Sequence, residues 1–317
     1  MNCGRLTRHL HFALLAALVL ALATLLGLAG AAHPASALDR EAKQLMGGSD
    51  WYHALEVIAS VNETPPEVPL VLLLGGSAAR ECTVSDGDWT AQVLRRGGLE
   101  VVTRNIGSRN QSFYENVAFA KALPRVPTIV YIGVNLGRYT FAYTTSAVPL
   151  TPDPEIAARH NQHHLPRTIL TLAEKRALVP RWLTRRYPIF RSRYTYNLGQ
   201  LERVIRICKR RGLHPVMLDL PRNMIVIGHA FDRPIQRYQQ GCRALAKKYH
   251  VPFLNFVRDA RLLNRDFQDL AHIVESGRTK FQRLLSDKTI ALLKRYDMVP
   301  PPIYEEPTPT PSASPTS

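Results

Sequence analysis

The sequence predicts an α/β protein: a three-layer α/β/α sandwich with a five-stranded parallel sheet as its middle layer. Five short apolar runs alternate along the chain with amphipathic stretches of helical length, which is the pattern of successive βαβ units. The first run, residues 68–74, is continuously apolar, as is typical of a strand that helices cover on both faces. With 45% hydrophobic residues among 317, the chain can bury the core that such a sandwich requires.

The first half of this pattern contains three strands and the two helices between them. After the strand at 68–74, the expected elements are a helix at 89–96, a strand at 99–103, a helix at 112–123 and a strand at 128–132. Asp86 or Asp88 is the expected N-cap of the first helix, because a short acidic side chain can accept from the free N–H groups of a first turn.

The second half resumes the alternation about sixty residues later. The expected elements are a helix at 197–211, a strand at 215–220, a helix at 235–249, a strand at 252–256 and a last helix at 277–296. Each successive pair of strands is separated by a helix, so the strands should run parallel with helices on both faces of the sheet.

The segment 136–196 interrupts the pattern. It contains six prolines, too many for one long helix, so short helices and loops laid over the domain are expected. An insertion of this length is commonly a lid or a binding element. Residues 175–193 hold seven basic side chains and no acidic one, interleaved with Trp182, Tyr187 and Phe190. This stretch could rest on a membrane surface, bind an anionic polymer or form a solvated basic face.

The two ends of the chain differ from the domain between them, which should span residues 38–299. Arg5 and Arg8 precede an uncharged apolar run at 12–29, and small residues follow at 35–37. Residues 1–37 are therefore expected to be a signal peptide or a membrane anchor, and both place the domain outside the cytoplasm. Residues 300–317 are mainly Pro, Thr and Ser, which predicts a disordered tail.

The charge balance indicates an anionic partner. The chain has 41 Lys and Arg against 25 Asp and Glu, a net charge of +16, which favours acidic glycans, lipid head groups or phosphate polymers. Export argues against nucleic acid as the partner. The N-terminal segment and the charge together point to the cell envelope.

Three cysteines, Cys82, Cys208 and Cys242, lie beyond the N-terminal segment. An odd number permits one internal disulfide at most. If one forms, Cys208 with Cys242 is the expected pair, because both fall in predicted helices that flank one strand. Three buried thiols are the alternative.

A polar residue or a glycine follows four of the five predicted strands. Ser77 comes after a glycine pair at the end of the first strand, Gly107 follows the second and Asn135 the third. Asp269 and His272 come after the fifth strand, just before the last helix. Because the carboxyl ends of parallel strands meet at one edge of the sheet, where ligands bind, these residues should converge.

Together these residues predict the chemistry of an esterase. Ser77 can act as the nucleophile once a base takes its proton, and the His272 imidazole can accept that proton at neutral pH. Asp269, three residues earlier, can hold the imidazole in the required tautomer. The backbone N–H groups of Ser77 and Gly107 and the side-chain amide of Asn135 are the expected donors to the oxyanion.

Other polar residues near these positions carry weaker signals. Arg80, Glu81 and Arg109 flank the expected site. Arg80 and Arg109 are candidate substrate contacts, and the alternative is that the three side chains pair with one another. The histidines at 160, 163 and 164 have no carboxylate at a supporting spacing, so solvated side chains are expected there and no metal. The chemistry requires no cofactor.

At this point the sequence resembles the SGNH hydrolases, the GDSL-like esterases and lipases, over about residues 69–293. The family's four motif blocks fall on Ser77, Gly107, Asn135 and the run from Asp269 to His272. Two positions depart from the pattern, because Gly76 and Leu136 stand where the family has aspartates. The resemblance implies a flavodoxin-like SGNH hydrolase fold.

The resulting hypothesis is an exported serine esterase that cleaves an acyl ester of an envelope carbohydrate or lipid. Two alternatives remain open. The same triad could pass the acyl group to a sugar hydroxyl, which would make the protein an envelope O-acyltransferase. A degenerate site could instead leave a protein that only binds envelope polyanions.

Overall fold

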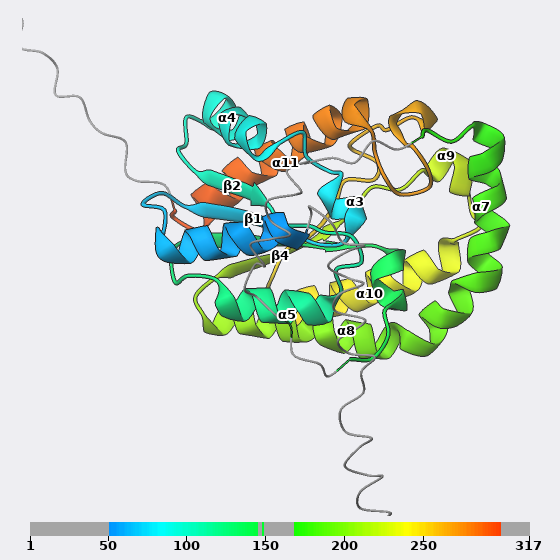
Figure 1. Cartoon of the computed structure of the whole chain (residues 1–317), viewed down its shortest axis with the longest axis horizontal. Coiled ribbons are helices and arrows are strands. Elements are labelled where there is room, and N and C mark those ends of the chain that lie inside the picture. The colour runs from blue at the N-terminus through cyan, green and yellow to red at the C-terminus, as the bar shows by residue number, and fades with distance from the viewer. Residues whose placement is uncertain (1–50, 145–147, 149–167, 299–317) are drawn as a thin grey trace, which may run out of the picture.

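The computed structural model describes residues 51–144, 148 and 168–298 of the chain (Figure 1). The signal peptide or anchor expected at 1–37, the tail expected at 300–317 and the histidines at 160, 163 and 164 lie outside these residues. No helix in the described part is both long and apolar enough to cross a lipid bilayer.

Five parallel strands form one sheet, in the order β2-β1-β3-β4-β5. The strands are β1 (Leu70–Leu74), β2 (Val102–Asn105), β3 (Thr128–Val134), β4 (His214–Asp219) and β5 (Phe253–Asn255). This confirms the predicted α/β class, and the strand order is that of flavodoxin-like sheets. The order reverses between β1 and β3, so a crevice opens where the loops after these two strands diverge.

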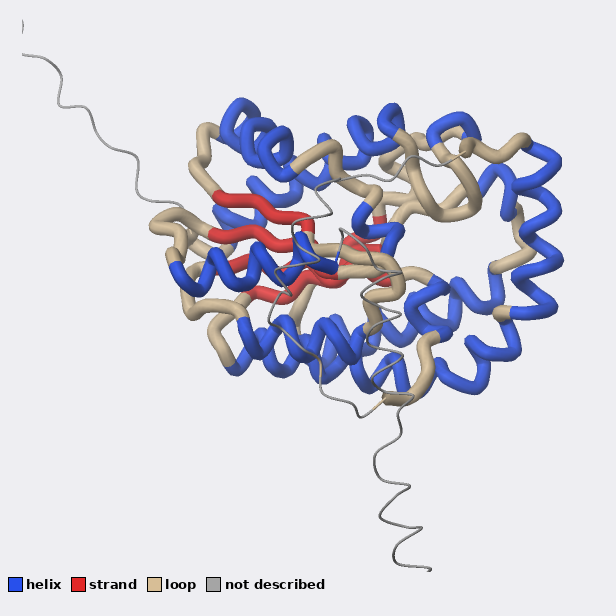
Figure 2. The backbone as a smooth tube through the Cα atoms, viewed as in Figure 1, coloured by secondary structure: helices blue, strands red, loops and turns tan. Residues whose placement is uncertain are grey.

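Helices cover both faces of the sheet and enclose two separate cores (Figures 1 and 2). One face carries a helix at residues 51–63, α5 (Phe113–Ala122), α8 (Tyr187–Arg210) and α10 (Asp232–Tyr249); the other carries α4 (Asp86–Gly97) and α11 (Glu275–Arg295). In β1, Leu72 faces the first core and Leu73 the second, and both are fully buried. The helix at 51–63 has no counterpart among the predicted elements.

Side-chain caps fix where the helices begin. Ser85 caps α4 by accepting from the Asp88 N–H at 3.0 Å, so the prediction of Asp86 or Asp88 as the cap is wrong. The two aspartates lie instead in the first turn, where their charge complements the positive end of the helix dipole. Ser112 caps α5 and forms a capping box with Glu115, which satisfies two N–H groups that have no helical partner.

The described part of the insertion is far more helical than predicted. After the short η1 (Leu136–Thr140), the chain forms α7 (Leu172–Arg185), and α8 follows after Arg186 alone. The expectation of short helices and loops is therefore wrong for residues 168–196. Pro188 lies in the first turn of α8, where a missing N–H costs nothing. Pro180 lies inside α7, which continues past it.

Only some of the basic residues at 175–193 face solvent. Lys175 is buried, whereas Arg176, Arg181, Arg185 and Arg191 are exposed. The interleaved aromatic residues point inward: Phe190 is fully buried, and the Trp182 ring packs on Phe231 at 4.5 Å between centroids. A contact with a polymer or a membrane surface would therefore rest on the arginines and not on these rings.

The three cysteines of the described region are free thiols, so the predicted disulfide between Cys208 and Cys242 is wrong. Each is buried in a core, and burial raises the pKa of both Cys208 and Cys242 to about 12. Cys242 is engaged in another contact, because its Sγ lies 3.3 Å from the Tyr139 hydroxyl. The alternative of three buried thiols holds.

Candidate active site

The chain makes a tight turn at the carboxyl end of β1 that presents Ser77. Gly75 and Gly76 form the turn, and Ser77 is the first residue of the short helix α3 (Ser77–Arg80). A Cβ on Gly75 would lie 2.4 Å from the Cβ of Ala79, so only glycine permits the helix to fold back this closely on the strand. The serine side chain is half-buried and faces the crevice beyond β1 and β3.

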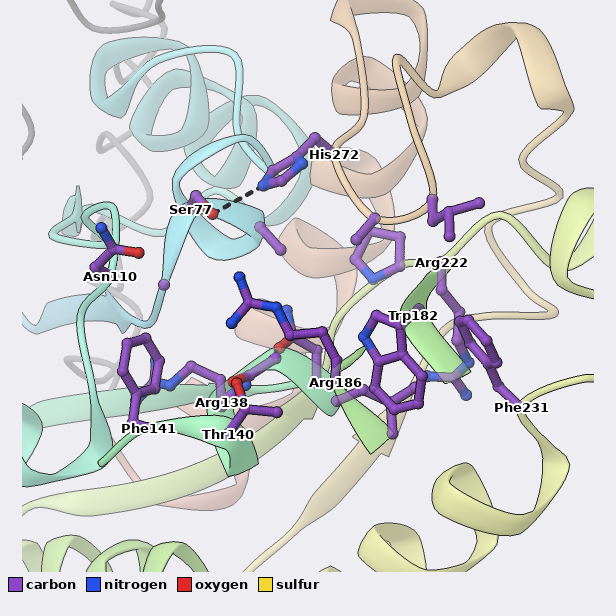
Figure 3. A pocket seen from close by; sticks show the side chains of 18 of the residues that line it. Ser77, Asn110, Arg138, Thr140, Phe141, Trp182, Arg186, Arg222, Phe231 and His272 are labelled. Atoms are coloured by element: carbon purple, nitrogen blue, oxygen red, sulfur yellow. Dashed lines mark hydrogen bonds between the residues drawn. The ribbon is translucent and has the colours of Figure 1, made fainter. Parts of the chain in front are cut away.

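Ser77, His272 and Asp269 form one continuous chain of hydrogen bonds (Figure 3 shows the serine and the histidine). The Ser77 Oγ lies 2.8 Å from the His272 Nε2, and the His272 Nδ1 lies 2.6 Å from the Asp269 Oδ2. A carboxylate only accepts, so Nδ1 carries the proton and Nε2 is left to accept from the serine hydroxyl. The three residues that the sequence predicted to converge therefore do so.

Asp269 is held in its charged form. Burial raises its pKa, but hydrogen bonding and the charge of His272, together with the backbone N–H groups of Ala271 and His272, lower the pKa to about 2. Both N–H groups donate to Oδ1 at 2.8 Å, and Oδ2 is left for the imidazole. The carboxylate is thus fixed in position and ionised throughout the neutral pH range.

Asn135 follows β3 and lines the same crevice as Ser77. Its Oδ1 accepts from the Arg138 N–H at 3.1 Å and caps η1. Because the oxygen is used in this way, the orientation of the amide is fixed, and the Nδ2 hydrogens remain available to a ligand in the crevice. Asn135 therefore lies on the crevice with Ser77, as the sequence predicted, and its role as a donor stays a prediction.

Gly107 does not have the geometry that the sequence predicted. Its N–H donates to the Asn105 Oδ1 at 3.0 Å, and it does not line the crevice, so the expectation that it faces the oxyanion is wrong. A Cβ at this position would lie 2.8 Å from the Arg80 backbone nitrogen. Gly107 therefore lets the loop after β2 pack closely on α3.

Asn110, three residues after Gly107 in the loop that follows β2, faces the crevice instead. It lines the crevice, its φ is 55°, and no hydrogen bond within the described part of the chain uses its N–H. Asparagine is one of the few non-glycine residues that adopt this left-handed conformation readily. That preference, three residues after Gly107, is the signal that the sequence analysis missed.

The two arginines predicted to contact substrate lie elsewhere. Arg80 is 1% exposed and lies within the domain, where its Nη1 is 3.5 Å from the Asn105 carbonyl oxygen. Neither Arg80 nor Arg109 lines the crevice, so this prediction is wrong. The neighbouring Glu81 forms an ion pair with Arg278 of α11 and so connects α3 to that helix.

Arg138 lies beneath the turn that carries Ser77. Its guanidinium is buried against the Phe113 ring at 4.2 Å and donates to Asn116. A Cβ on Gly76 would lie 3.4 Å from the Arg138 Cδ, an ordinary contact distance, so the Arg138 side chain packs directly against this turn. Burial lowers the Arg138 pKa to about 9, against the effect of Glu115, which raises it. The side chain is therefore still charged at neutral pH.

The crevice widens into a cavity of about 480 Å³ next to Ser77 and His272 (Figure 3). Phe141, Trp182 and Phe231 supply much of its apolar wall. Among the residues that the structure describes, the charged side chains that line it are four arginines: Arg138, Arg186, Arg193 and Arg222. Trp182 lies in α7, Arg186 lies between α7 and α8, and Arg193 lies in α8. The insertion therefore forms one wall of the cavity.

The loop that carries Asp269 and His272 is attached to the insertion through a buried amine. The Lys175 Nζ, on α7, donates to the Phe267 carbonyl at 2.6 Å and to the Asn264 carbonyl at 3.1 Å. On its other side the Leu270 carbonyl accepts from the Asn223 N–H at 2.9 Å. These contacts fix the backbone on both sides of Asp269.

Within the described residues, no group of three or more His, Cys, Asp or Glu side chains is placed to hold a metal ion. The chemistry available at this site is that of a nucleophile, its base, an orienting carboxylate and nearby N–H donors.

No protein-family model matches the chain, and no curated protein matches it either. Several solved structures are similar. They include a carbohydrate esterase family 3 protein from Talaromyces cellulolyticus, with 11% identity over 72% of this chain and 99% of that one and a TM-score of 0.43. The acetyl xylan esterase AlAXEase shares 13% identity over 71% and 99% of the two chains, with a TM-score of 0.42.

Proposed function

We propose that this protein is a serine esterase of the SGNH type that cleaves an acyl ester through an acyl-serine intermediate. One observation carries the proposal: the 2.8 Å and 2.6 Å hydrogen bonds that join Ser77 to His272 and His272 to Asp269 at the mouth of a cavity. A nucleophile, a base and an orienting carboxylate in this order are the groups that acyl transfer needs.

In the first half of the proposed reaction, His272 takes the proton of the Ser77 hydroxyl as Oγ attacks the acyl carbon. The negative charge that forms on the carbonyl oxygen is stabilised by N–H donors, a role that we assign to the Asn135 amide and the backbone N–H groups of Ser77 and Asn110. The intermediate then collapses, the carbon–oxygen bond to the alcohol breaks, and His272 gives its proton to the leaving oxygen.

In the second half, water replaces the alcohol. His272 removes a proton from the water as its oxygen attacks the acyl-serine, and the same donors stabilise the second oxyanion. Collapse releases the carboxylic acid and returns the proton to the Ser77 oxygen. Asp269, ionised at neutral pH, stabilises the imidazolium that forms in both halves without itself taking the proton.

We also propose that the protein acts outside the cytoplasm, in the cell envelope. The support is the N-terminal sequence, in which Arg5 and Arg8 precede the apolar run at 12–29. The exposed arginines of α7 and α8 would be the contacts to an anionic envelope polymer or a membrane surface.

A fluorophosphonate probe tests the nucleophile assignment, because it reacts covalently with an activated serine. We expect the probe to modify Ser77, identified by peptide mapping, and we expect Ser77→Ala to abolish both this labelling and the hydrolysis of short-chain aryl esters. Ser60→Ala, at an exposed serine of the helix at 51–63, is the matched control and should behave as wild type. Full turnover by a folded Ser77→Ala variant would refute the proposal.

A further inference from the structure

The charged side chains that line the cavity next to Ser77 are all positive among the described residues. Four arginines line it, and none of the described residues that line it is Asp or Glu. Two of these arginines already donate to other side chains. Arg222 donates to both carboxylate oxygens of Asp219, at 2.8 and 3.2 Å, and Arg138 is buried beneath the Ser77 turn, where it donates to Asn116.

Arg186 has no such partner. It is the single residue between α7 and α8, and its side chain is exposed and lines the cavity. Figure 3 shows its side chain extending into the cavity on the side of Ser77. No hydrogen bond or ion pair within the described part of the chain uses its guanidinium, so its N–H donors remain available to a ligand.

Arg193 lies in α8, two helical turns after Arg186, which is the residue directly before that helix. The two residues are seven apart, which places them on one face of α8, two turns from each other. The Nη1 of Arg193 donates to the Thr140 carbonyl at 2.9 Å. This bond fixes the guanidinium at the cavity wall and leaves its other donors available to a ligand.

The wall around these charges is largely aromatic. Trp182 lies one helical turn before Arg186, and its ring packs on Phe231 at 4.5 Å, with Phe141 elsewhere on the wall. A cation beside apolar surface is less well screened than one in bulk water, so it attracts an anion more strongly. A planar guanidinium also matches the paired oxygens of a carboxylate or phosphate.

We propose that the substrate of this site is an ester that carries a carboxylate or phosphate group, and that Arg186, assisted by Arg193, binds this group at the cavity wall. The inference rests on the proposed esterase function and narrows it to anionic esters. Arg186 then acts as a specificity-determining residue, because it holds the acyl carbon of a charged ester in reach of Ser77.

Matched pairs of esters test this. Mono-(4-nitrophenyl) adipate and 4-nitrophenyl hexanoate differ by a carboxylate on the acyl side. 4-Acetoxybenzoate and 4-acetoxyphenyl phosphate, each compared with phenyl acetate, place a carboxylate or a phosphate on the alcohol side. We expect wild type to prefer at least one anionic ester, about tenfold or more in kcat/KM, as is typical of a charge-assisted contact. The ester pair with the largest preference identifies whether the bound group is a carboxylate or a phosphate, and whether it lies on the acyl or the alcohol side of the ester.

The variants then assign the preference to a residue. Arg186→Gln should reduce the ratio of anionic to neutral kcat/KM about tenfold, Arg186→Lys should retain part of it, and added salt should weaken it. Arg185→Gln removes an equal charge one residue earlier, at an exposed arginine that does not line the cavity, and should keep the wild-type ratio. Equal ratios in wild type and Arg186→Gln, or no anionic preference in wild type, would overturn the proposal.

A binding measurement separates this inference from the esterase proposal. In Ser77→Ala, titration with benzoate and phenyl phosphate should quench the fluorescence of Trp182, and Arg186→Gln in the same background should weaken the affinity about tenfold. If no ester is hydrolysed but this anion binding persists, the esterase proposal fails and the anion site stands. If hydrolysis depends on Ser77 but neither anion binds, the anion site fails alone.

Discussion

At the scale of single residues, Asn135 has two separate tasks that different atoms of one amide perform. Its oxygen caps η1 by accepting from the Arg138 N–H at 3.1 Å, and its nitrogen is left to face the crevice. The cap fixes the amide, so the donor needs no reorganisation when the oxyanion forms, which is the condition under which such donors are most effective.

This division of tasks permits a sharp test. Asn135→Asp keeps an oxygen for the cap but removes the N–H donors, so it should fold like wild type and lower kcat for an aryl ester about 10² to 10³-fold. Asn135→Ala should show the same kinetic loss and also lose about 1 kcal/mol of stability with the cap. Steady-state kinetics and thermal unfolding of both variants measure this. An effect of Asn135→Asp confined to KM would make the residue a substrate contact only.

At the scale of elements, apolar sequence runs located all five strands but not their limits. Leu99 and Val101 are buried, as the second run predicts, yet β2 begins only at Val102. Hydrophobicity shows which residues are buried, whereas a strand is defined by hydrogen bonds to its neighbours, and these depend on the register of the sheet. The strand ends, and with them Ser77 and Asn135, were close enough for the site to be predicted.

The sequence could not predict the arginine wall of the cavity. Arg186 and Arg193 belong to α7 and α8, and Arg222 follows β4, so their meeting depends on how the insertion packs over the sheet. The prolines also misled the prediction, because Pro188 is harmless in a first turn. Arg80 is three residues from Ser77 and Arg109 is two residues from Gly107, so both are closer in sequence to the predicted site than Arg186 or Arg193 is. Closeness in sequence does not set the direction in which a side chain points.

The contact between α7 and the loop that carries Asp269 and His272 yields a prediction at the scale of elements. Lys175→Met removes the amine that donates to the Phe267 and Asn264 carbonyls and leaves two backbone acceptors without it, which should cost about 1–3 kcal/mol of stability. We expect kcat for a neutral aryl ester to fall about tenfold with KM little changed, because Asp269 and His272 lose a fixed position while the cavity wall remains.

The exposed neighbour supplies the control. Arg176→Met changes the adjacent residue of α7, which faces solvent, and should leave both constants near the wild-type values. The rate of fluorophosphonate labelling at Ser77 gives a second readout that does not depend on turnover. If Lys175→Met lowers stability but labels at the wild-type rate, the lysine stabilises the fold without positioning the triad.

At the scale of the whole molecule, the sheet joins two cores that do not touch each other directly. Leu72 and Leu73 are neighbours in β1, but their side chains enter opposite cores. The candidate active site draws on both layers: His272 comes from the loop before α11 on one face, and the cavity wall comes from α7 and α8, which continue on the other. The geometry of the triad therefore requires the two layers to hold together.

This arrangement predicts that the two cores unfold as one unit. Leu72→Ala and Leu73→Ala each leave a cavity in a different core and should each cost about 2–5 kcal/mol. The fluorescence of the three tryptophans reports the unfolding of both cores. Trp89 lies in the core that contains Leu73, whereas Trp51 lies in the core that contains Leu72 and Trp182 packs against it. Two backgrounds are used: one retains Trp89 as the single tryptophan, and the other lacks Trp89 alone. Each leucine variant should lower the urea midpoint of the fluorescence transition by the same amount in both backgrounds. A Leu73→Ala variant that moved the Trp89 transition alone would show that the layers unfold separately.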